Sequence, residues 1–434
     1  MRKAIREPRA LQLRITGMKA GAALLLVGLV GLGIASPTET AASRERAAKP
    51  PATVLAWRWV NRRGVELVRL DRRSLGIASK RRVLVGKSTS AWARSPDAKR
   101  IAVGVDVALG IRIVDAIKMR RAGAVGTRNG QVRAMAWLTP NRIVGAEETG
   151  IFVVDPVARR LVSARATEGQ VFGATRTANA LVLLLAPDDG IGRARLATLT
   201  ADGAYRTVEL REISAGFRYP TQTDEPPGER RNPGLAVDAA GERAFVVGAG
   251  EPVAEVDLRS LAVSYHEPAR PISLFGRLRN WLEPKAEAKG PVLGSTRKVL
   301  WLGNGRLAVT GEDGRPGRDG IVVHPAGLSL IDTRSWSVET VQRDATSATT
   351  AGGTLIAWVS GPELQAIGLR GYDLDGDERF HLFGSRGAAV LERLDERVFV
   401  DDGAVTYAVD ARAGRIVRVV SQVPQLLVGS MQRY

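Results

Sequence analysis

The sequence predicts an all-β protein in which one four-stranded unit is repeated around a ring, a β-propeller. Three observations lead to this prediction. Short apolar runs ending in aspartate recur along the chain, turn residues separate them, and almost no helical periodicity interrupts them. A period in the forties, with one long exception between Asp257 and Asp332, indicates a repeat architecture, and four short strands per period indicate an antiparallel blade. The aspartates are Asp71, Asp115, Asp155, Asp202, Asp257, Asp332, Asp373 and Asp410.

Each repeat has the same pattern around its aspartate. In one repeat, turn residues 238–241 precede the run Arg-Ala-Phe-Val-Val-Gly at 243–248. Downstream, Asp-Leu-Arg-Ser-Leu at 257–261 leads into another β-branched run. An aspartate carboxylate can accept hydrogen bonds from backbone N–H groups two residues further on. We therefore expect each aspartate to close the hairpin between the third and fourth strands of its blade.

Two stretches resemble known propeller repeats. Residues 234–248, Gly-Leu-Ala-Val-Asp-Ala-Ala-Gly-Glu-Arg-Ala-Phe-Val-Val-Gly, followed by Val-Asp-Leu at 256–258, resemble a blade of the bacterial YVTN and WD40-like propellers. Residues 95–100, Ser-Pro-Asp-Ala-Lys-Arg, resemble their Ser-Pro-Asp-Gly-Lys turn. The Trp-Asp dipeptide and the Gly-His of true WD40 blades are absent. The resemblance therefore implies a fold and transfers no functional residue.

The number of aspartate-ended runs predicts eight blades over residues 53–430. Seven is the alternative, because the unit around Asp202 is weak. The first unit lacks a leading strand, whereas residues 425–430 form one apolar run too many at the C-terminal end. We expect this C-terminal strand to pair with the first blade and close the ring.

The N-terminal 36 residues have the pattern of an export signal. Residues 1–19 carry six Lys and Arg against one Glu, and residues 20–36 carry no charge. A positive region before an apolar one is typical of a signal peptide, and this run is also just long enough to form a membrane-spanning helix. Residues 1–36 are therefore predicted to be a signal peptide or an N-terminal membrane anchor, and residues 37–52 a linker. The remainder is expected outside the cytoplasm, either anchored by residues 20–36 or secreted.

Positive charge is concentrated near the start of the predicted propeller. Residues 51–135 carry 19 Lys and Arg against 5 Asp and Glu, whereas residues 136–434 carry 35 against 37. Such a face attracts anionic surfaces, although a solvated rim is the alternative interpretation. The residues predicted to bind an anionic partner are Arg72, Arg73, Lys80, Arg81 and Arg82.

Two insertions interrupt the repeats. Residues 218–233 form a polar, proline-rich stretch that is predicted to be a loop. Residues 268–292 contain a predicted amphipathic helix, capped by Ser273 and ended by Pro284. Its apolar stripe either packs on the propeller or docks a partner. The predicted docking residues are Leu274, Phe275, Arg277, Leu278 and Trp281.

The chain offers little for catalysis. It has no Cys, which excludes thiolate nucleophiles, disulfides and cysteine-ligated metals, and its three His residues are scattered. Neither a Gly-x-Ser-x-Gly elbow nor a phosphate-binding glycine loop is present. The carboxylates of residues 373–378 depart from calcium-loop spacing and fit a turn. We predict no catalytic residue, no metal site and no cofactor.

These features favour an extracytoplasmic, non-catalytic binding or scaffold propeller that presents its loops to a protein or to an anionic envelope polymer. Membrane contact would come from the N-terminal segment if it is not cleaved, and nucleic acid is not an expected partner of an exported chain. The alternative is an exported propeller hydrolase or lyase that acts on carbohydrate through carboxylates near the channel mouth.

Overall fold

The computed structural model describes residues within the compact unit Leu32–Tyr434. The other unit, Met1–Gly31, lies outside the described residues, as do the predicted linker and the predicted helix of residues 273–284. Among the described residues, no helix is long and apolar enough to cross a membrane. The described residues are 53–60, 64–86, 89–105, 110–127, 130–218, 229–269, 294–317, 320–360, 366–382, 391–401, 405–420 and 425–427.

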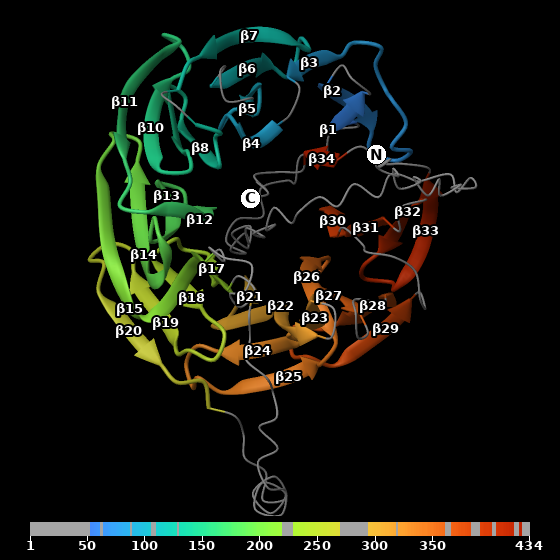
Figure 1. Ribbon diagram of the computed structural model, residues 1–434. Coiled ribbons are helices and arrows are strands. Elements are labelled where there is room, and N and C mark those ends of the chain that lie inside the picture. Colours follow the sequence, from blue (N-terminus) through green and yellow to red (C-terminus); the bar gives the residue numbers. More distant parts are fainter. Residues whose placement is uncertain are drawn as a thin grey trace, which may run out of the picture. The chain divides into compact units, whose positions relative to one another are not determined.

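The described residues form sheets arranged around a common centre, antiparallel except where β16 pairs with β21, so the predicted all-β propeller is confirmed (Figure 1). Six of the sheets are four-stranded blades. Three of them consist of β1 (Thr53–Val60), β2 (Gly64–Asp71), β3 (Val83–Gly86) and β34 (Gln425–Leu427); β4 (Thr89–Arg94), β5 (Arg100–Val105), β6 (Ile111–Asp115) and β7 (Arg120–Val125); and β8 (Ala134–Thr139), β9 (Arg142–Ala146), β10 (Gly150–Asp155) and β11 (Arg160–Ala166).

The other three blades have the same chain order from the centre outwards. They consist of β17 (Gly234–Val237), β18 (Arg243–Val247), β19 (Val253–Asp257) and β20 (Val263–His266); β26 (Ala345–Ala351), β27 (Thr354–Ser360), β28 (Ala366–Tyr372) and β29 (Glu378–Leu382); and β30 (Leu391–Leu394), β31 (Arg397–Asp401), β32 (Thr406–Asp410) and β33 (Arg415–Val420).

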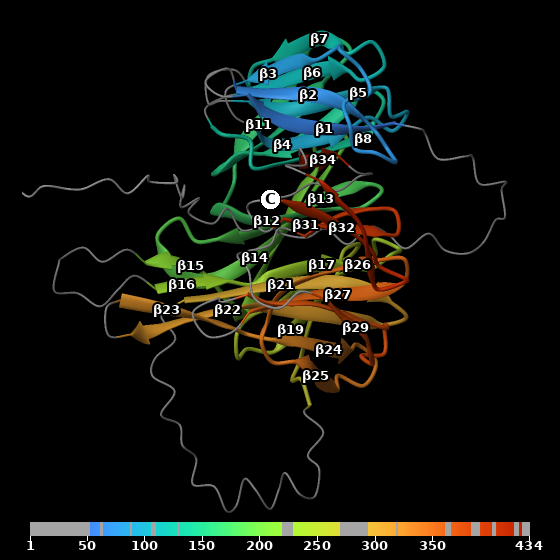
Figure 2. The ribbon, with the colours of Figure 1, turned by 90° about the vertical axis from the view of Figure 1, so that its right-hand side faces the viewer.

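The remaining ten strands form a single sheet that the sequence did not predict. It contains β12 (Gln170–Arg176), β13 (Ala180–Ala186), β14 (Gly190–Thr200), β15 (Tyr205–Arg218), β16 (Glu229–Asn232), β21 (Gly294–Gly303), β22 (Arg306–Gly317), β23 (Gly320–Pro325), β24 (Leu328–Asp332) and β25 (Val338–Gln342). In Figure 2, β15, β16, β22 and β23 extend on one side of the ring.

The predicted count of eight blades, with seven as the alternative, is therefore wrong: the structure has six separate blades. The count of aspartate-ended runs gave too many blades because β16 pairs with strands that the repeat pattern assigns to different blades. Its Arg231 lies opposite Gly216 of β15 in antiparallel register, and its Arg230 lies opposite Gly294 of β21 in parallel register. This strand belongs to the insertion 218–233, which we had predicted to be a loop.

The C-terminal strand pairs with the first blade, as the surplus apolar run predicted. Leu427 of β34 lies opposite Leu55 of β1. A side-chain contact supports this junction, because Arg72 Nε donates a 2.8 Å hydrogen bond to Asp395, which lies between β30 and β31. The ends of the ring are therefore joined by backbone pairing and by an ion pair.

The predicted role of the aspartates in closing hairpins is confirmed. Asp257 Oδ1 accepts hydrogen bonds from the backbone N–H groups of Arg259 and Ser260, at 3.0 and 2.6 Å. The same pair of bonds forms at Asp71, Asp115, Asp155, Asp332 and Asp410. The fifth residue of these turns has a φ between 51° and 63°, at Leu75, Met119, Arg159, Leu261, Trp336 and Gly414.

The hydrophobic core lies between neighbouring sheets. Phe245 of β18 stacks on Trp301 of β21, with the ring centroids 5.4 Å apart. Arginines add a second kind of contact, because each reaches a turn carbonyl in the next sheet around the ring. Arg69 donates to Ala116 at 2.7 Å, and the others are Arg206 to Arg259, Arg306 to Leu374, and Arg418 to Arg73.

Candidate binding surface

The predicted anion-binding residues lie in and after the turn between β2 and β3, and the structure separates them into two groups. Arg72 is held by Asp395 at the ring closure, so its charge is neutralised there. Arg82 lies 3.9 Å from Glu66. The side chains of Arg73, Lys80 and Arg81 are exposed and lie at the N-terminal end of the outer strand β3.

This end of β3 belongs to a larger surface. Its strands are β33, β3, β7 and β11, the outer strands of four blades, and it also includes the turns that precede them; we call it the basic rim. None of these four strands contains an acidic residue. By contrast, the outer strands β15, β25 and β29 each contain glutamate. The exposed cations of the basic rim are Arg73, Lys80, Arg81, Arg82, Lys118, Arg120, Arg121, Arg159, Arg160, Arg165, Arg412, Arg415 and Arg418.

Contacts between neighbouring blades make the basic rim continuous. Arg121 of β7 donates a 2.9 Å hydrogen bond to the Leu84 carbonyl of β3. Arg159, before β11, covers Gly123 of β7, where an added Cβ would lie 3.0 Å from Arg159 Nε. The Arg418 bond links β33 to the turn before β3. The order β33, β3, β7 and β11 can be followed along the outside of the ring in Figure 1.

The turn aspartates beside the basic rim are engaged in hydrogen bonds of their own. Hydrogen bonding from Ser74 holds the pKa of Asp71 below its usual value. The backbone N–H of Ala158 does the same to the pKa of Asp155, which also pairs with Arg142 at 3.1 Å. Both carboxylates are therefore ionised at neutral pH, and both are held by hydrogen bonds within their own turns.

Exposed aliphatic side chains accompany the cations. Ile117 is 61% exposed and Val157 is 59% exposed, and both lie in the turn just before an outer strand of the basic rim. Among the described residues, every large hydrophobic side chain that is exposed lies on the basic rim, with the exception of Ile321 in β23. The others are Ile77, Leu84, Val162, Ile416, Val417 and Val419.

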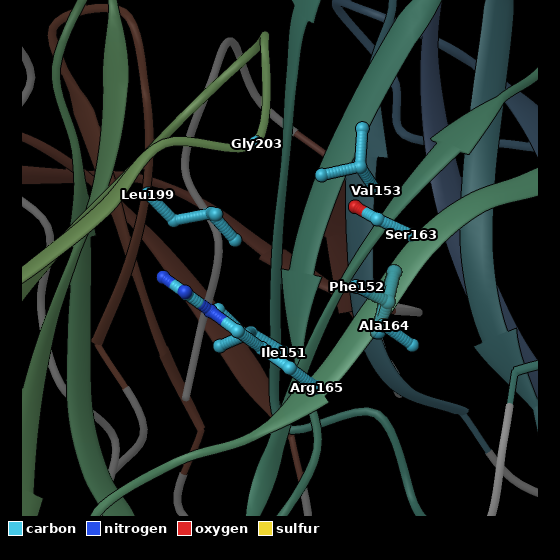
Figure 3. A pocket seen from close by; sticks show the side chains of 8 residues that line it. All are labelled: Ile151, Phe152, Val153, Ser163, Ala164, Arg165, Leu199 and Gly203. Carbon is cyan, nitrogen blue, oxygen red and sulfur yellow. The ribbon is translucent and has the colours of Figure 1, made fainter.

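A small cavity opens at the end of the basic rim (Figure 3). Its volume is 240 Å³, and β11 lines it with Ser163 and Arg165. The Arg165 guanidinium lies 4.2 Å from the ring centroid of Tyr205. The rest of the lining is Ile151, Phe152, Val153, Ala164, Leu199 and Gly203. Such a cavity has room for one side chain or a similar small group, and it is smaller than typical cofactor sites.

Charges around the strand β16 are balanced. Arg231 pairs with Glu229 at 2.9 Å, and Arg297 pairs with Asp313 at 2.8 Å. Glu251 is the half-buried acid of this region, and burial raises the pKa of its carboxyl group. Its Oε1 accepts a 3.0 Å hydrogen bond from the Ser214 backbone N–H. This region contrasts with the basic rim, where, among the described residues, only Arg82 of the exposed cations pairs with an acid, Glu66 at 3.9 Å.

Metal-ligating side chains do not gather in the described part of the chain: no group of three or more His, Asp or Glu residues lies close enough to hold an ion. His266 stacks on Trp336, with centroids 3.7 Å apart, and contacts Glu255 at 3.1 Å. The predicted docking residues Leu274, Phe275, Arg277, Leu278 and Trp281 lie outside the described residues.

Sequence reasoning found part of the basic rim and missed the rest. It identified the cations around β3 from the local charge excess but missed Arg159, Arg160, Arg415 and Arg418, because whole-segment charge counts average them with acids elsewhere in the chain. The charge of the run after each turn aspartate would have identified them. In these repeats the run after the turn aspartate contains at least three Lys or Arg and no acid, whereas the run after Asp257, which also lacks an acid, contains only Arg259.

Comparison with known structures agrees with the fold. Dihydro-heme d1 dehydrogenase NirN in complex with DHE is similar with a TM-score of 0.55 and 12% identity, over 91% of this chain and 79% of that chain. BamB from Moraxella catarrhalis has a TM-score of 0.47 and 12% identity, over 82% and 92% of the two chains. Apo AztD from Citrobacter koseri has a TM-score of 0.48 and 10% identity, over 87% and 96%.

At these identities the likeness concerns the fold alone, and it agrees with the propeller fold that the repeats predict. No protein-family model and no curated protein matches the chain.

Proposed function

We propose that this chain is a non-catalytic binding propeller that works outside the cytoplasm and uses the basic rim to hold an anionic envelope partner, with its insertions available to a protein partner. The observation that carries the proposal is the uneven charge of the outer strands. The strands β7, β11 and β33 and the turn before β3 (residues 72–82) contain arginine and no acid, whereas β15, β25 and β29 contain glutamate. A surface of one sign attracts ligands of the other sign over roughly a Debye length, about 8 Å at physiological salt.

Retention of the full chain on dextran sulfate beads in increasing salt tests the proposal. The test variant carries Arg81→Glu, Arg120→Glu and Arg160→Glu, three exposed side chains of the basic rim. The matched control reverses three exposed arginines elsewhere on the ring and changes the net charge equally; these are Arg211, Arg259 and Arg379.

We expect the wild type and the control variant to elute at similar salt concentrations, and the rim variant to elute at a much lower one. Equal loss of retention in both variants would mean that net charge alone acts. If the rim variant is retained as strongly as the wild type, the basic rim is a solvated surface without a partner.

The extracytoplasmic location is a separate part of the proposal and rests on the charge step between residues 1–19 and residues 20–36. A reporter enzyme that is active only after export, fused behind residues 1–52, is expected to be active. A fusion that stays wholly in the cytoplasm would refute this location.

A carbohydrate hydrolase or lyase is the second candidate, and Glu251 is the residue that favours it. Burial raises the pKa of its carboxyl group, as a general acid requires. Screening the full chain against polysaccharides, with Glu251→Gln as the matched variant, separates the two functions. Turnover by the wild type that is lost in Glu251→Gln would favour the enzyme, and no turnover by either protein is the result expected of a binding module.

A further inference from the structure

We propose that the anionic partner of the basic rim is a lipid bilayer, so that the ring lies with this rim against the membrane surface. The inference rests on the proposed function, because it names the partner of the same surface. The placement of exposed aliphatic side chains among the cations of the basic rim favours a bilayer over a soluble polyanion.

Cations and aliphatic side chains alternate in the same way in three adjacent blades. Ile77 precedes Arg81 at the start of β3, Ile117 precedes Arg120 at the start of β7, and Val157 precedes Arg160 at the start of β11. The fourth strand, β33, combines two arginines with three exposed aliphatic residues, Ile416, Val417 and Val419.

A polyanion in water offers nothing to an aliphatic side chain, whereas a bilayer interface accepts both groups. Lysine and arginine bind the headgroups, and aliphatic side chains enter the boundary with the acyl chains. Eight of the nine large hydrophobic side chains that are exposed among the described residues lie on the basic rim, and such a concentration marks a site of interaction. The two kinds of side chain together therefore favour anionic lipid.

The course of the chain agrees with this orientation. Thr53, the first residue of β1, lies opposite Asp71, so the chain enters the ring at the turn that precedes β3. Residues 37–52 are a predicted linker between this point and the predicted membrane segment. Sixteen residues span at most about 55 Å when extended, so a ring tethered at Thr53 can rest with the basic rim on the same membrane.

Site-specific labels on the full chain test the proposal, and the absence of Cys from the sequence makes each introduced thiol unique. Ile117→Cys and Val157→Cys place an environment-sensitive fluorophore on the basic rim. The matched control is Thr340→Cys, an exposed position in β25. Each protein is mixed with phosphatidylcholine vesicles that contain a spin-labelled quenching lipid, with and without phosphatidylglycerol.

We expect quenching at positions 117 and 157 on vesicles that contain phosphatidylglycerol, weak quenching on phosphatidylcholine alone, and none at position 340. Each cation near an anionic surface contributes about fivefold to binding, so the triple reversal at Arg81, Arg120 and Arg160, which also adds repulsion, should lower docking at least about a hundredfold. Replacing Ile117 by serine should lower docking about fivefold when the label is at position 157.

Equal quenching at positions 117 and 340, or equal quenching with and without phosphatidylglycerol, would overturn the proposal. If rim labels stay unquenched while retention on dextran sulfate still depends on the rim arginines, the lipid partner is wrong and the proposed function stands. If neither vesicles nor dextran sulfate respond to the rim variant, both are wrong.

Discussion

Gly145 provides a sensitive test of the packing that supports the basic rim. It lies in β9 directly opposite Phe152 of β10, a phenyl ring that is 2% exposed. A Cβ added at Gly145 would lie 2.2 Å from Phe152 Cζ and 2.9 Å from the Ala134 carbonyl oxygen. Phe152 belongs to a buried cluster with Met135, Trp137 and Ile143, so its ring can shift only at a cost in packing. Gly145→Ala should therefore destabilise the chain by about 3 kcal/mol, the upper range for overpacking a closed core.

A double-mutant cycle separates this clash from other effects. Leucine at position 152 lacks the ring atoms that an alanine at position 145 would meet, so Gly145→Ala should cost only about 1 kcal/mol in a Phe152→Leu background. Gly126→Ala is the matched control, because nothing lies within 4 Å of a Cβ added there. Guanidinium unfolding followed by circular dichroism measures all four variants. Equal stability of Gly145→Ala and Gly126→Ala, or strict additivity with Phe152→Leu, would refute the reasoning.

Three further outcomes follow from the turns and the ring closure. Ala98 has a φ of 58°, so Ala98→Gly should stabilise the chain by about 0.5–1 kcal/mol in chemical unfolding, and a loss of stability would contradict this. Deleting residues 424–434 removes the pairing of β34 with β1 and should cost about 2–4 kcal/mol, so an unchanged melting temperature would contradict closure. Hydrogen bonds from Ser260 hold the pKa of Asp257 below its unfolded value, so the stabilisation that the Asp257 carboxylate gives is complete above about pH 5 and is lost as the pH falls through the folded pKa. Asp257→Asn should therefore weaken the fall of the unfolding free energy at acid pH. An unchanged fall would exclude this role of Asp257.

The sequence predicted those parts of the fold that depend on local patterning. Hairpin closure by aspartate was predictable because the carboxylate bonds residues only two and three positions away, as at Asp257. Pairing of the C-terminal strand was predictable from a surplus run at one end and a missing strand at the other. Both inferences need only the period of the repeat.

The sequence did not predict features that depend on distant pairing. β16 pairs with β21, whose paired residues lie more than sixty positions further along the chain, and its Glu-Arg-Arg-Asn sequence has no strand signal. The left-handed turn residues were equally hidden, because Leu75 and Trp336 occupy a conformation usually signalled by glycine. Strong hydrogen bonding by the turn aspartate imposes that conformation.

The candidate site was only partly predictable for the same reason. Charge runs near β3 are local, so they were found. The continuity of the basic rim depends on Arg121 reaching Leu84 and on Arg418 reaching Arg73, contacts between blades far apart in the sequence. The loss of Arg72 from the binding surface depends on Asp395, which is also distant in the chain.

Hydrogen–deuterium exchange of the full chain with and without dextran sulfate tests most directly whether the basic rim is the binding surface. We predict slower amide exchange at the outer strands of the basic rim and the turns before them, in residues 77–86, 117–125, 157–166 and 415–420, with no change in the outer strands at 205–213, 338–342 and 378–382. Protection of that second set of strands, or no protection anywhere, would contradict the account.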